Sequence, residues 1–346
     1  MGESGNLSAE SGAAEQVDLE KHKKVFSSLG FRFLLGTIAI YGVQILVINL
    51  VARFAPMWLM NRDIAFSVGM LPMYLIGMPI MILLIRKLPA SVPEKHSMKP
   101  WHFVLAAIMC YGLMLICNLT GLWLTALIGV LKGSVVQNTV VNVINNGSMW
   151  VNVLYVVICA PIIEEYVFRK LLVDRTLRYG QGVAVLMSGL LFGLFHGNLN
   201  QFVYAFPMGL FLAFLYVRTG KLKISIALHM ICNFFGSVLA PWLVEISHMD
   251  EYTRLVQTGA GQQELAEFMT AYLPGWIAYM CYSILVYVIM LASVVLFIVF
   301  RKRFTLRKGE VAIPKGMRFK TIFVNVGMAL CTLLLLALII YQLLFV

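Results

Sequence analysis

Two adjacent carboxylates, Glu164 and Glu165, interrupt an apolar stretch that is otherwise typical of a membrane-spanning helix. A charged side chain near the centre of a bilayer costs at least about 2.5–3.5 kcal/mol, so this pair needs a partner, a proton or a hydrated cavity. Residues four apart in a helix share a face, whereas neighbours point about 100° apart. Arg169 is therefore the expected partner of Glu165, which leaves Glu164 as the better candidate for a reacting carboxylate. The alternative is that both carboxylates only tie helices together.

Two further polar pairs occur at the same helical spacing in later apolar segments. Phe192 and His196 share a face of one segment, and His229 and Asn233 share a face of another. A single histidine in a membrane helix is more often hydrogen-bonded across the bundle than reactive. Together with Glu164, however, the histidines form a set of groups that exchange protons, either in catalysis or in a proton relay.

The backbone near these groups is expected to be irregular at two places. Pro161 lacks a backbone N–H, which predicts a kink and a freed carbonyl beside Glu164. The segments 182–196 and 202–217 each span roughly 22–24 Å as helices, which is short for a membrane crossing. The polar turn 197–200 between them is then expected at membrane depth, where non-helical backbone persists only inside protein or beside a hydrated cavity. Both features indicate a polar chamber.

The depth of these groups in the membrane raises a difficulty. Glu164 precedes the basic residues Arg169 and Lys170, which places it toward the cytoplasmic side, and His229 follows a basic cluster in the same way. His196 is expected to lie deeper, so straight spanning helices would not bring all the groups together. A short re-entrant hairpin, a tilt or a broken helix would reconcile the depths.

Composition shows what kind of fold must position these residues. The chain has 346 residues, of which 60% are hydrophobic and 12% charged, whereas about 25% of residues are charged in a typical soluble domain. The sequence therefore predicts an all-α, polytopic membrane helical bundle with about eight or nine transmembrane segments. The apolar stretches are 31–51, 64–85, 101–131, 148–168, 182–196, 202–217, 222–246, 274–300 and 321–346.

The net charge of +11 does not indicate nucleic-acid binding, because the basic residues follow the pattern of cytoplasmic loops. They gather before the first segment and in alternate connections, including Arg169, Lys170, Arg175 and Arg178 on the side assigned to the cytoplasm. The sequence thus predicts an integral multi-pass protein, with a bacterial cell membrane as the expected location, whose N-terminus is cytoplasmic and whose C-terminus is outside.

Outside the membrane spans, the sequence predicts a tail and loops and no second domain. The first twenty residues are acidic and polar and lack the apolar core of a signal peptide, and residues 1–28 are predicted to be a disordered cytoplasmic tail. Residues 29–346 form a single helical membrane domain, and the polar stretch 247–273 is expected to be a loop. The six cysteines fall in apolar segments without CxxC spacing and are interpreted as buried hydrophobic residues.

The ordered motifs EExxxR (164–169), FxxxH (192–196) and HxxxN (229–233) resemble those of the CPBP family. This family includes the type II CAAX prenyl endopeptidases and the Abi, or bacteriocin self-immunity, proteins. The resemblance covers about 145–240. It implies an all-helical intramembrane endopeptidase that cuts a membrane-associated peptide or protein, with a prenylated CAAX peptide and a bacteriocin-like peptide as the candidate substrates.

The resemblance also implies roles for individual residues. Glu164 corresponds to the family's catalytic glutamate, with His196 beside it activating water, while His229 and Asn233 stabilise the oxyanion. Glu165 with Arg169 would support the helix. No cofactor is expected on this interpretation, and the alternative is a zinc ion held by Glu164, His196 and His229. The absence of an HExxH sequence favours the glutamate mechanism.

A different class of function stays open on the sequence alone. The same polar cluster is compatible with a non-proteolytic membrane scaffold, an immunity protein or a proton-coupled transporter. Transport is less favoured because the sequence shows no paired broken helices in two related halves. The sequence identifies neither the substrate nor a residue that would recognise a prenyl group.

Overall fold

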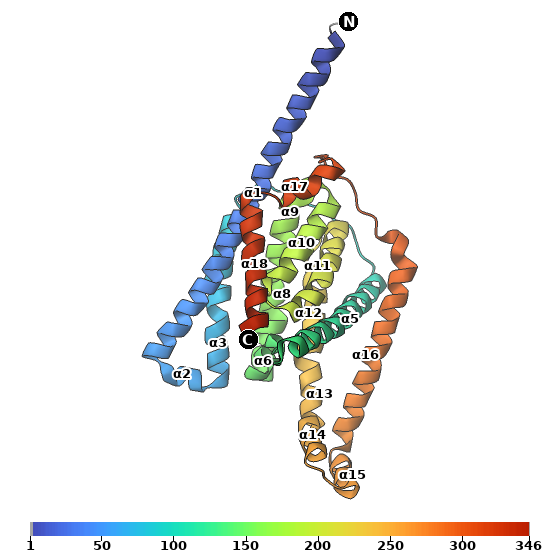
Figure 1. Ribbon diagram of the computed structural model, residues 1–346. Helices are drawn as coiled ribbons and strands as arrows, with labels where there is room; N and C mark the ends of the chain where they lie inside the picture. Colours follow the sequence, from blue (N-terminus) through green and yellow to red (C-terminus); the bar gives the residue numbers. More distant parts are fainter. Residues whose placement is uncertain (1–2, 346) are drawn as a thin grey trace.

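The computed structural model is a bundle of membrane-length helices (Figure 1). It describes the backbone of residues 3–345 and the side chains of residues 19–345 apart from 140, 143, 146 and 315. This part of the chain contains no β-strand, and eight of its helical runs are long and apolar enough to cross a membrane. They are Leu19–Phe54, Arg62–Ile85, Pro100–Lys132, Met149–Tyr179, Leu199–Thr219, Leu222–Ile246, Leu273–Arg303 and Val326–Phe345. With the shorter apolar helix Gln181–Phe195, they confirm the predicted polytopic all-α bundle.

The elements follow the order of the apolar stretches along the chain. The α-helices are α1 (Glu3–Phe54), α2 (Pro56–Met60), α3 (Arg62–Pro72), α4 (Met78–Ile85), α5 (Pro100–Lys132), α6 (Thr139–Asn146), α7 (Met149–Asn152), α8 (Ala160–Glu165), α9 (Asp174–Thr176), α10 (Gln181–Phe195), α11 (Leu199–Thr219), α12 (Leu222–Phe234), α13 (Ala240–Ile246), α14 (Met249–Gln257), α15 (Gln262–Ala271), α16 (Leu273–Phe300), α17 (Arg318–Ile322) and α18 (Val326–Phe345). Short 3₁₀ turns occur at Leu177–Tyr179, Arg301–Arg303 and Lys315–Met317.

Several spans change from α-helical to π-helical hydrogen bonding and back. The π-helical segments are η1 (Met73–Gly77), η2 (Val153–Cys159), η3 (Tyr166–Val173) and η5 (Phe235–Leu239). Such insertions are rare and concentrate at functional sites. Here η2 and η3 lie on either side of α8, the short helix that carries the two carboxylates.

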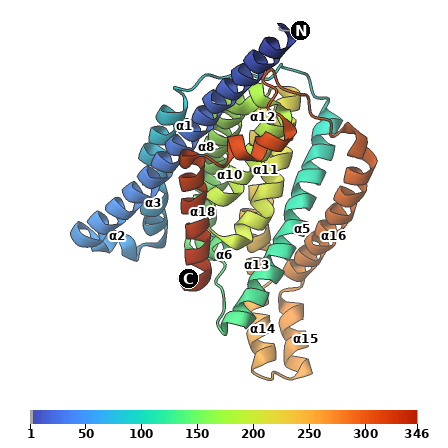
Figure 2. The same ribbon diagram turned by 45° about the horizontal axis from the view of Figure 1, so that its top comes forward.

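The centre of the bundle is the helix pair α10 and α11, which Figure 2 shows between α18 and α5. Small residues let the two helices approach closely: a Cβ added at Gly209 would lie 3.0 Å from the Cα of Gly189. Packing of this kind replaces the hydrophobic effect as the force that joins helices in lipid. Phe192 of α10 is fully buried as a result.

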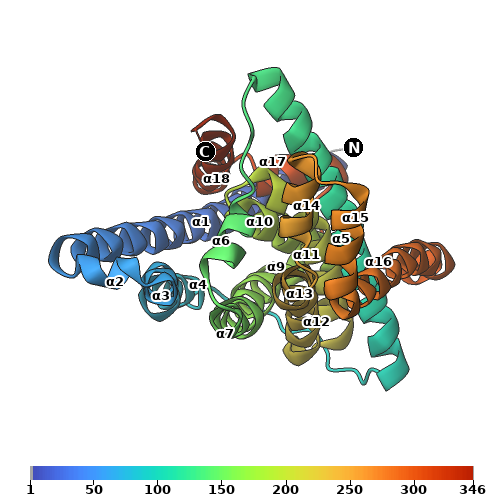
Figure 3. The same cartoon turned by 90° about the horizontal axis from the view of Figure 1, so that it is seen from below.

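The edges of the bundle face the lipid. In the view from below, α1 and α16 lie at opposite edges (Figure 3). Only 6% of the apolar window of the span Leu273–Arg303 is buried, although this is the most apolar span of the chain. A helix that is apolar all round without being buried is typical of a surface exposed to acyl chains.

The polar stretch predicted as the loop 247–273 is instead mostly helical. It forms α14 and α15, a hairpin that projects beyond the bundle (Figure 1). Tyr252 packs against Trp276 with ring centroids 4.9 Å apart and against Phe268 at 6.2 Å. These contacts between aromatic rings join segments that are distant in sequence, which explains why the polar composition alone did not predict the helices.

The first helix begins well before the predicted domain boundary at residue 29. The structure continues α1 back to Glu3, beyond the bundle (Figure 1). Within the predicted tail, Phe26 and His22 are buried, and their rings lie 4.7 Å and 5.3 Å from that of Tyr179. The end of the predicted tail is therefore packed against the bundle through His22 and Phe26.

Two of the arginines assigned to a cytoplasmic connection lie inside the bundle. Arg169 is fully buried and Arg175 is 8% exposed, both within the span Met149–Tyr179. Arg175 donates to the carbonyls of Ile85 and Arg86 at 2.7 and 2.9 Å, which satisfies the open end of α4. Both arginines connect helices inside the bundle, so they do not indicate which side of the membrane is cytoplasmic. The predicted orientation depends on the other basic residues and stays a prediction.

Candidate active site

The helical run Met149–Tyr179 places the two carboxylates near the middle of a span. The sequence predicts that this segment ends at residue 168, which would place Glu164 close to the cytoplasmic surface. The additional turns up to Tyr179 move it inward. Its depth therefore no longer conflicts with the expected depth of His196.

The freed carbonyl predicted from Pro161 is present and has a specific partner. In η2 the N–H of Ala160 donates to the carbonyl of Tyr155, five residues back. The next carbonyl in this π-helical register is that of Val156, and its donor would be residue 161, which is proline. Asn233 of α12 supplies the missing donor, since its Nδ2 donates to Val156 O at 2.8 Å.

Glu165 is fully buried and forms an ion pair with Arg169. Its Oε2 lies 2.9 Å from Arg169 Nε, and its Oε1 accepts from Arg169 Nη2 at 3.0 Å. This is the pair predicted from the spacing of four residues. Arg169 also donates to Ser188 Oγ at 2.7 Å and lies over the ring of Phe192 at 4.7 Å. A two-point contact between guanidinium and carboxylate fixes the geometry of both groups.

His229 connects the two carboxylates. Its Nδ1 lies 3.1 Å from Glu165 Oε1, and its Nε2 lies 3.9 Å from Glu164 Oε2. The side chain is 4% exposed, compared with 14% for Glu164. An ionised carboxylate can only accept a hydrogen bond, so Nδ1 carries a proton toward Glu165 and Nε2 is directed toward Glu164.

His196 is oriented by its own helix. Its Nδ1 lies 2.7 Å from the carbonyl of Phe192. A carbonyl can only accept, so Nδ1 is the protonated nitrogen and Nε2 carries the lone pair in the neutral ring. The ring of Phe192 meets His196 edge-on at 4.9 Å and His229 edge-on at 5.7 Å. Phe192 thus separates the two histidines and supports both.

All four residues predicted to carry the chemistry line one cavity of about 590 Å³. They are Glu164, His196, His229 and Asn233. The short helix α10 makes this possible, because it ends at Phe195 and leaves His196 at the level of Glu164 and His229. The other part of the cavity is lined by α6 and by Gln342 of α18, near the end of the bundle that holds the C-terminus (Figure 1).

The sequence analysis did not single out the uncharged polar residues of this cavity. Its wall carries a series of side-chain amides in addition to Asn233. They are Gln44, Asn118, Asn138, Asn198, Asn200, Gln201 and Gln342. For Gln44, Asn118 and Gln342 the available signal was an amide inside an apolar segment, where each polar group needs a partner. Asn198 and Asn200 belong to the turn that was predicted to line a chamber.

The donor set of the zinc alternative is not gathered around one point. Among the described residues, no three side chains of His, Cys, Asp or Glu are close enough together to hold a metal ion. Nδ1 of each histidine faces a protein acceptor, which leaves Nε2 as the nitrogen that could bind a metal. Because the three side chains of the zinc alternative are not gathered around one point, the mechanism proposed below uses protein groups alone.

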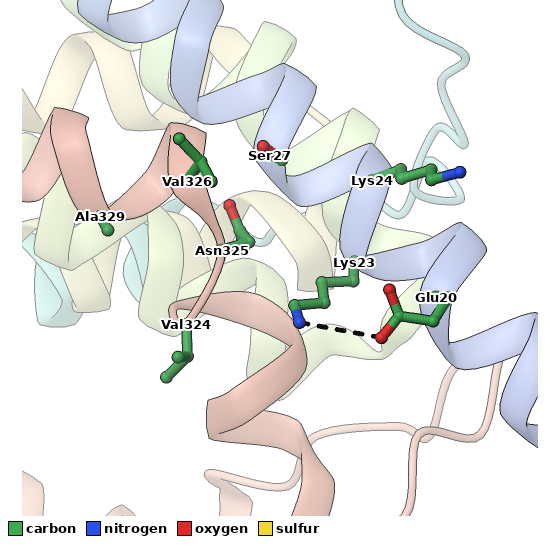
Figure 4. A pocket seen from close by; sticks show the side chains of 8 residues that line it. All are labelled: Glu20, Lys23, Lys24, Ser27, Val324, Asn325, Val326 and Ala329. Carbon is green, nitrogen blue, oxygen red and sulfur yellow. Dashed lines mark ion pairs between the residues drawn. The ribbon is translucent and has the colours of Figure 1, made fainter.

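A second hollow, between α1 and α18, has a different character. Figure 4 shows this groove of about 460 Å³, in which Lys23 and Glu20 form an ion pair at 3.7 Å. Lys24 and several apolar or small polar residues line the rest of it, including Ser27, whose Oγ accepts from the N–H of Gly327 at 3.0 Å. It contains neither a histidine nor an unpaired carboxylate among its lining residues. The groove lies between two helices, and its lining residues do not form a set suited to acid–base catalysis.

Comparison with known proteins gives one family model and two relatives that match parts of this chain. The model of the family described as "Type II CAAX prenyl endopeptidase Rce1-like" matches residues 146–235. The "Membrane-embedded CAAX protease MroQ" of Staphylococcus aureus (strain USA300) is 28% identical over 157 residues, which cover 43% of this chain and 60% of that protein. The "Putative membrane peptidase YdiL" of Bacillus subtilis (strain 168) is 34% identical over 86 residues, 24% of this chain and 34% of the relative. The matches thus span less than two thirds of either relative, and no solved structure matches significantly.

Proposed function

Because the chain belongs to the CPBP family of membrane proteases through residues 146–235, we propose that it is an intramembrane endopeptidase that hydrolyses a peptide bond of a membrane-associated peptide or protein. The observation that carries the proposal is the single cavity shared by Glu164, His196, His229 and Asn233. Amide hydrolysis needs a base for water, donors for the developing oxyanion and a proton for the leaving amine. The four side chains supply each of these groups.

Glu164 and His196 are proposed to activate the water. Glu164 is the carboxylate of the pair that lacks the arginine, so it is available to accept a proton. His196 presents the lone pair of Nε2, since its Nδ1–H is held by Phe192 O. A positioned general base contributes about 10²–10⁴-fold to the rate. The proton taken from water is then available for the leaving amine.

His229 and Asn233 are proposed to stabilise the oxyanion. Glu165 accepts from His229 Nδ1 and so holds the ring with Nε2 toward Glu164 and the cavity, where a proton on Nε2 would be donated to the oxyanion. Asn233 uses one N–H to hold Val156 O and has a second N–H for the substrate. Glu165 and Arg169 act in this scheme as positioning residues, because they set the orientation of His229.

The experiment uses the full chain in nanodiscs with a fluorogenic, membrane-tethered peptide. Glu164→Gln, Glu164→Ala, His196→Ala and His229→Ala are each expected to lower kcat by at least 10²-fold, while the thermal midpoint of Glu164→Gln stays close to that of the wild type. Glu94→Gln is the matched control, because Glu94 is 73% exposed and remote from the cavity lining. If all four variants cut the peptide normally, the catalytic assignment is wrong.

Metal dependence is a separate arm of the same assay. Dialysis against a chelator followed by metal analysis distinguishes glutamate-dependent hydrolysis, which we propose, from the zinc alternative. Retained cleavage in metal-free protein supports the former. A loss that zinc restores would instead assign Glu164, His196 and His229 as ligands.

The substrate is proposed to be a membrane-associated peptide, of the CAAX type or bacteriocin-like, in a bacterial cell membrane. The prenyl group enters only through the description of the matched family and the name of a relative. Comparing prenylated with unprenylated peptides of equal sequence decides this point. A phenotype that persists in Glu164→Gln cells would favour the scaffold, immunity or transport alternatives.

A further inference from the structure

Asn200 has a buried side chain that pairs with nothing in the described part of the protein. The residue is 5% exposed, and neither its Nδ2 nor its Oδ1 has a hydrogen-bond partner there. It lines the cavity that also contains Glu164 and His196. Leaving buried polar atoms unpaired is unfavourable, and proteins pair the large majority of them. An unpaired amide in the wall of this cavity therefore indicates an external partner.

The surrounding helices make room for this amide. A Cβ at Gly121 of α5 would lie 3.2 Å from Asn200 Nδ2 and 3.0 Å from Asn200 O. Glycine at position 121 thus allows α5 to pass directly beside the start of α11. The amide is held between this helix and the cavity, and any larger residue at 121 would displace it.

Asn198 provides the contrast within the same turn. It is equally buried, at 4% exposure, and it lines the same cavity. Its Oδ1, however, accepts from the N–H of Gln201 at 2.7 Å, which caps the N-terminus of α11. Its Nδ2 donates to His196 O at 3.2 Å. Two asparagines two residues apart therefore differ in their hydrogen bonds. The side chain of Asn198 pairs with groups of the protein, whereas that of Asn200 pairs with none in the described part of the chain.

The chemistry of an intramembrane peptide bond matches this unpaired amide. A scissile bond must leave its helix to be attacked, and an unwound segment then carries unpaired N–H and C=O groups in an apolar environment. An asparagine amide has a donor and an acceptor side by side, and so does a peptide backbone. The asparagine amide would therefore donate one hydrogen bond to the substrate backbone and accept another from it.

We propose that Asn200 binds the backbone of an unwound substrate segment next to the scissile bond. This inference rests on the proposed peptidase function and names the group that recognises the substrate. Because the contact is with the backbone, it selects an extended conformation at this point and not a particular side chain. Residues in the adjacent amide wall, such as Gln342, whose Oε1 is also unpaired among the described residues, extend the same surface.

The test measures KM and kcat of Asn200→Ala with peptides whose backbone is altered one position at a time. Replacing one amide by an ester removes its N–H without changing its side chain. For the wild type we expect one position near the scissile bond at which the ester raises KM about 10-fold, as expected for the loss of one well-placed hydrogen bond. Asn200→Ala should raise KM for the all-amide peptide by a similar factor and abolish this discrimination.

The controls separate binding from folding and from the function itself. The thermal midpoint of Asn200→Ala should equal or exceed that of the wild type, because the substitution removes unpaired buried groups, whereas Asn198→Ala should lower it. Unchanged KM and unchanged ester discrimination in an active Asn200→Ala enzyme would overturn the inference alone. Failure of the proposed function looks different: the wild type would not cut, or Glu164→Gln would cut normally.

Discussion

The helix that carries Glu164 and Glu165 has two polar faces with opposite properties. On one face, Glu165 and Arg169 are fully buried, and contacts of 2.7–3.0 Å join Arg169 to Glu165 and to Ser188 of α10. On the other face, Glu164 lies beside a cavity, with His229 Nε2 at 3.9 Å from its Oε2. Neighbouring residues of one chemical type thus occupy two environments, one closed by an ion pair and one open to a cavity.

The difference follows from what each carboxylate can do when it is paired. A carboxylate held by a two-point contact with an arginine has little freedom to take up a proton or to move toward a substrate. A carboxylate beside a cavity keeps its acceptor sites available. His229 connects the two environments, because Glu165 orients it and Glu164 faces it.

The largest expected effect is on the paired face. Arg169→Ala leaves Glu165 buried without its cation, so we expect a loss of about 3–5 kcal/mol in stability, as for other broken buried ion pairs. Thermal unfolding of the purified protein in detergent, followed by size-exclusion chromatography, measures it. Glu165→Leu combined with Arg169→Met should recover most of this loss, since the apolar pair leaves no unpaired charge. If Arg169→Ala alone were as stable as the wild type, the contrast between the faces would fail.

Asn233→Ala tests the cavity face. Removing one donor to an oxyanion lowers kcat by about 10²–10³-fold, which is roughly 2.7–4 kcal/mol. The same substitution also exposes Val156 O, so a smaller decrease in the thermal midpoint is expected. Steady-state kinetics with kcat and KM determined separately distinguish the two effects. A decrease in stability with normal kcat would assign Asn233 to the helix contact only.

Ser188→Ala tests the paired face with an expected loss of stability of intermediate size. Ser188 Oγ accepts from Arg169 and donates to Phe168 O at 2.8 Å. Loss of a hydrogen bond to a charged group is worth about 1.5–3 kcal/mol. We expect lower stability but normal kcat per folded molecule, which denaturation curves and active-site titration can establish. A selective loss of kcat would show that the paired face contributes to the chemistry.

The smallest expected effect concerns the cap of α11. Asn198→Ala removes the side chain that accepts from Gln201 N, which should lower stability by about 1 kcal/mol. Circular dichroism at increasing temperature is the measurement. Asn198→Ser, which can still cap the helix, should retain most of the stability. Equal losses in both variants would mean that the cap is not the reason Asn198 is needed.

Local geometry explains which parts of this site could be predicted. The pairing of Glu165 with Arg169 and the freed carbonyl near Pro161 both follow from the helix itself, and both are present. The partner of that carbonyl, Asn233, lies 77 residues away, and no periodicity indicates such a contact. The contact between His229 and Glu165 spans 64 residues and was not predicted for the same reason.

Depth in the membrane is the property that the sequence predicts least accurately. The basic residues that follow position 168 predict the end of the span there, whereas the helix continues to Tyr179 with Arg169 and Arg175 buried inside. Hydropathy treats an arginine as exposed, but the interior of a bundle can satisfy it with a carboxylate or with the carbonyls that end another helix. The roles of the catalytic candidates stay proposals that the experiments above address.

The sequence by itself determined the class of fold, the helical segments and the face on which each polar residue lies, because apolar length and a period of 3.6 residues are local properties. The tertiary structure decided which of these faces meet. Close packing of α10 and α11, the π-helical turns around α8 and the early end of α10 bring Glu164, His196, His229 and Asn233 to one cavity. It also left Asn200 unpaired beside them while Asn198 caps a helix, a distinction between identical side chains that arises only from their neighbours.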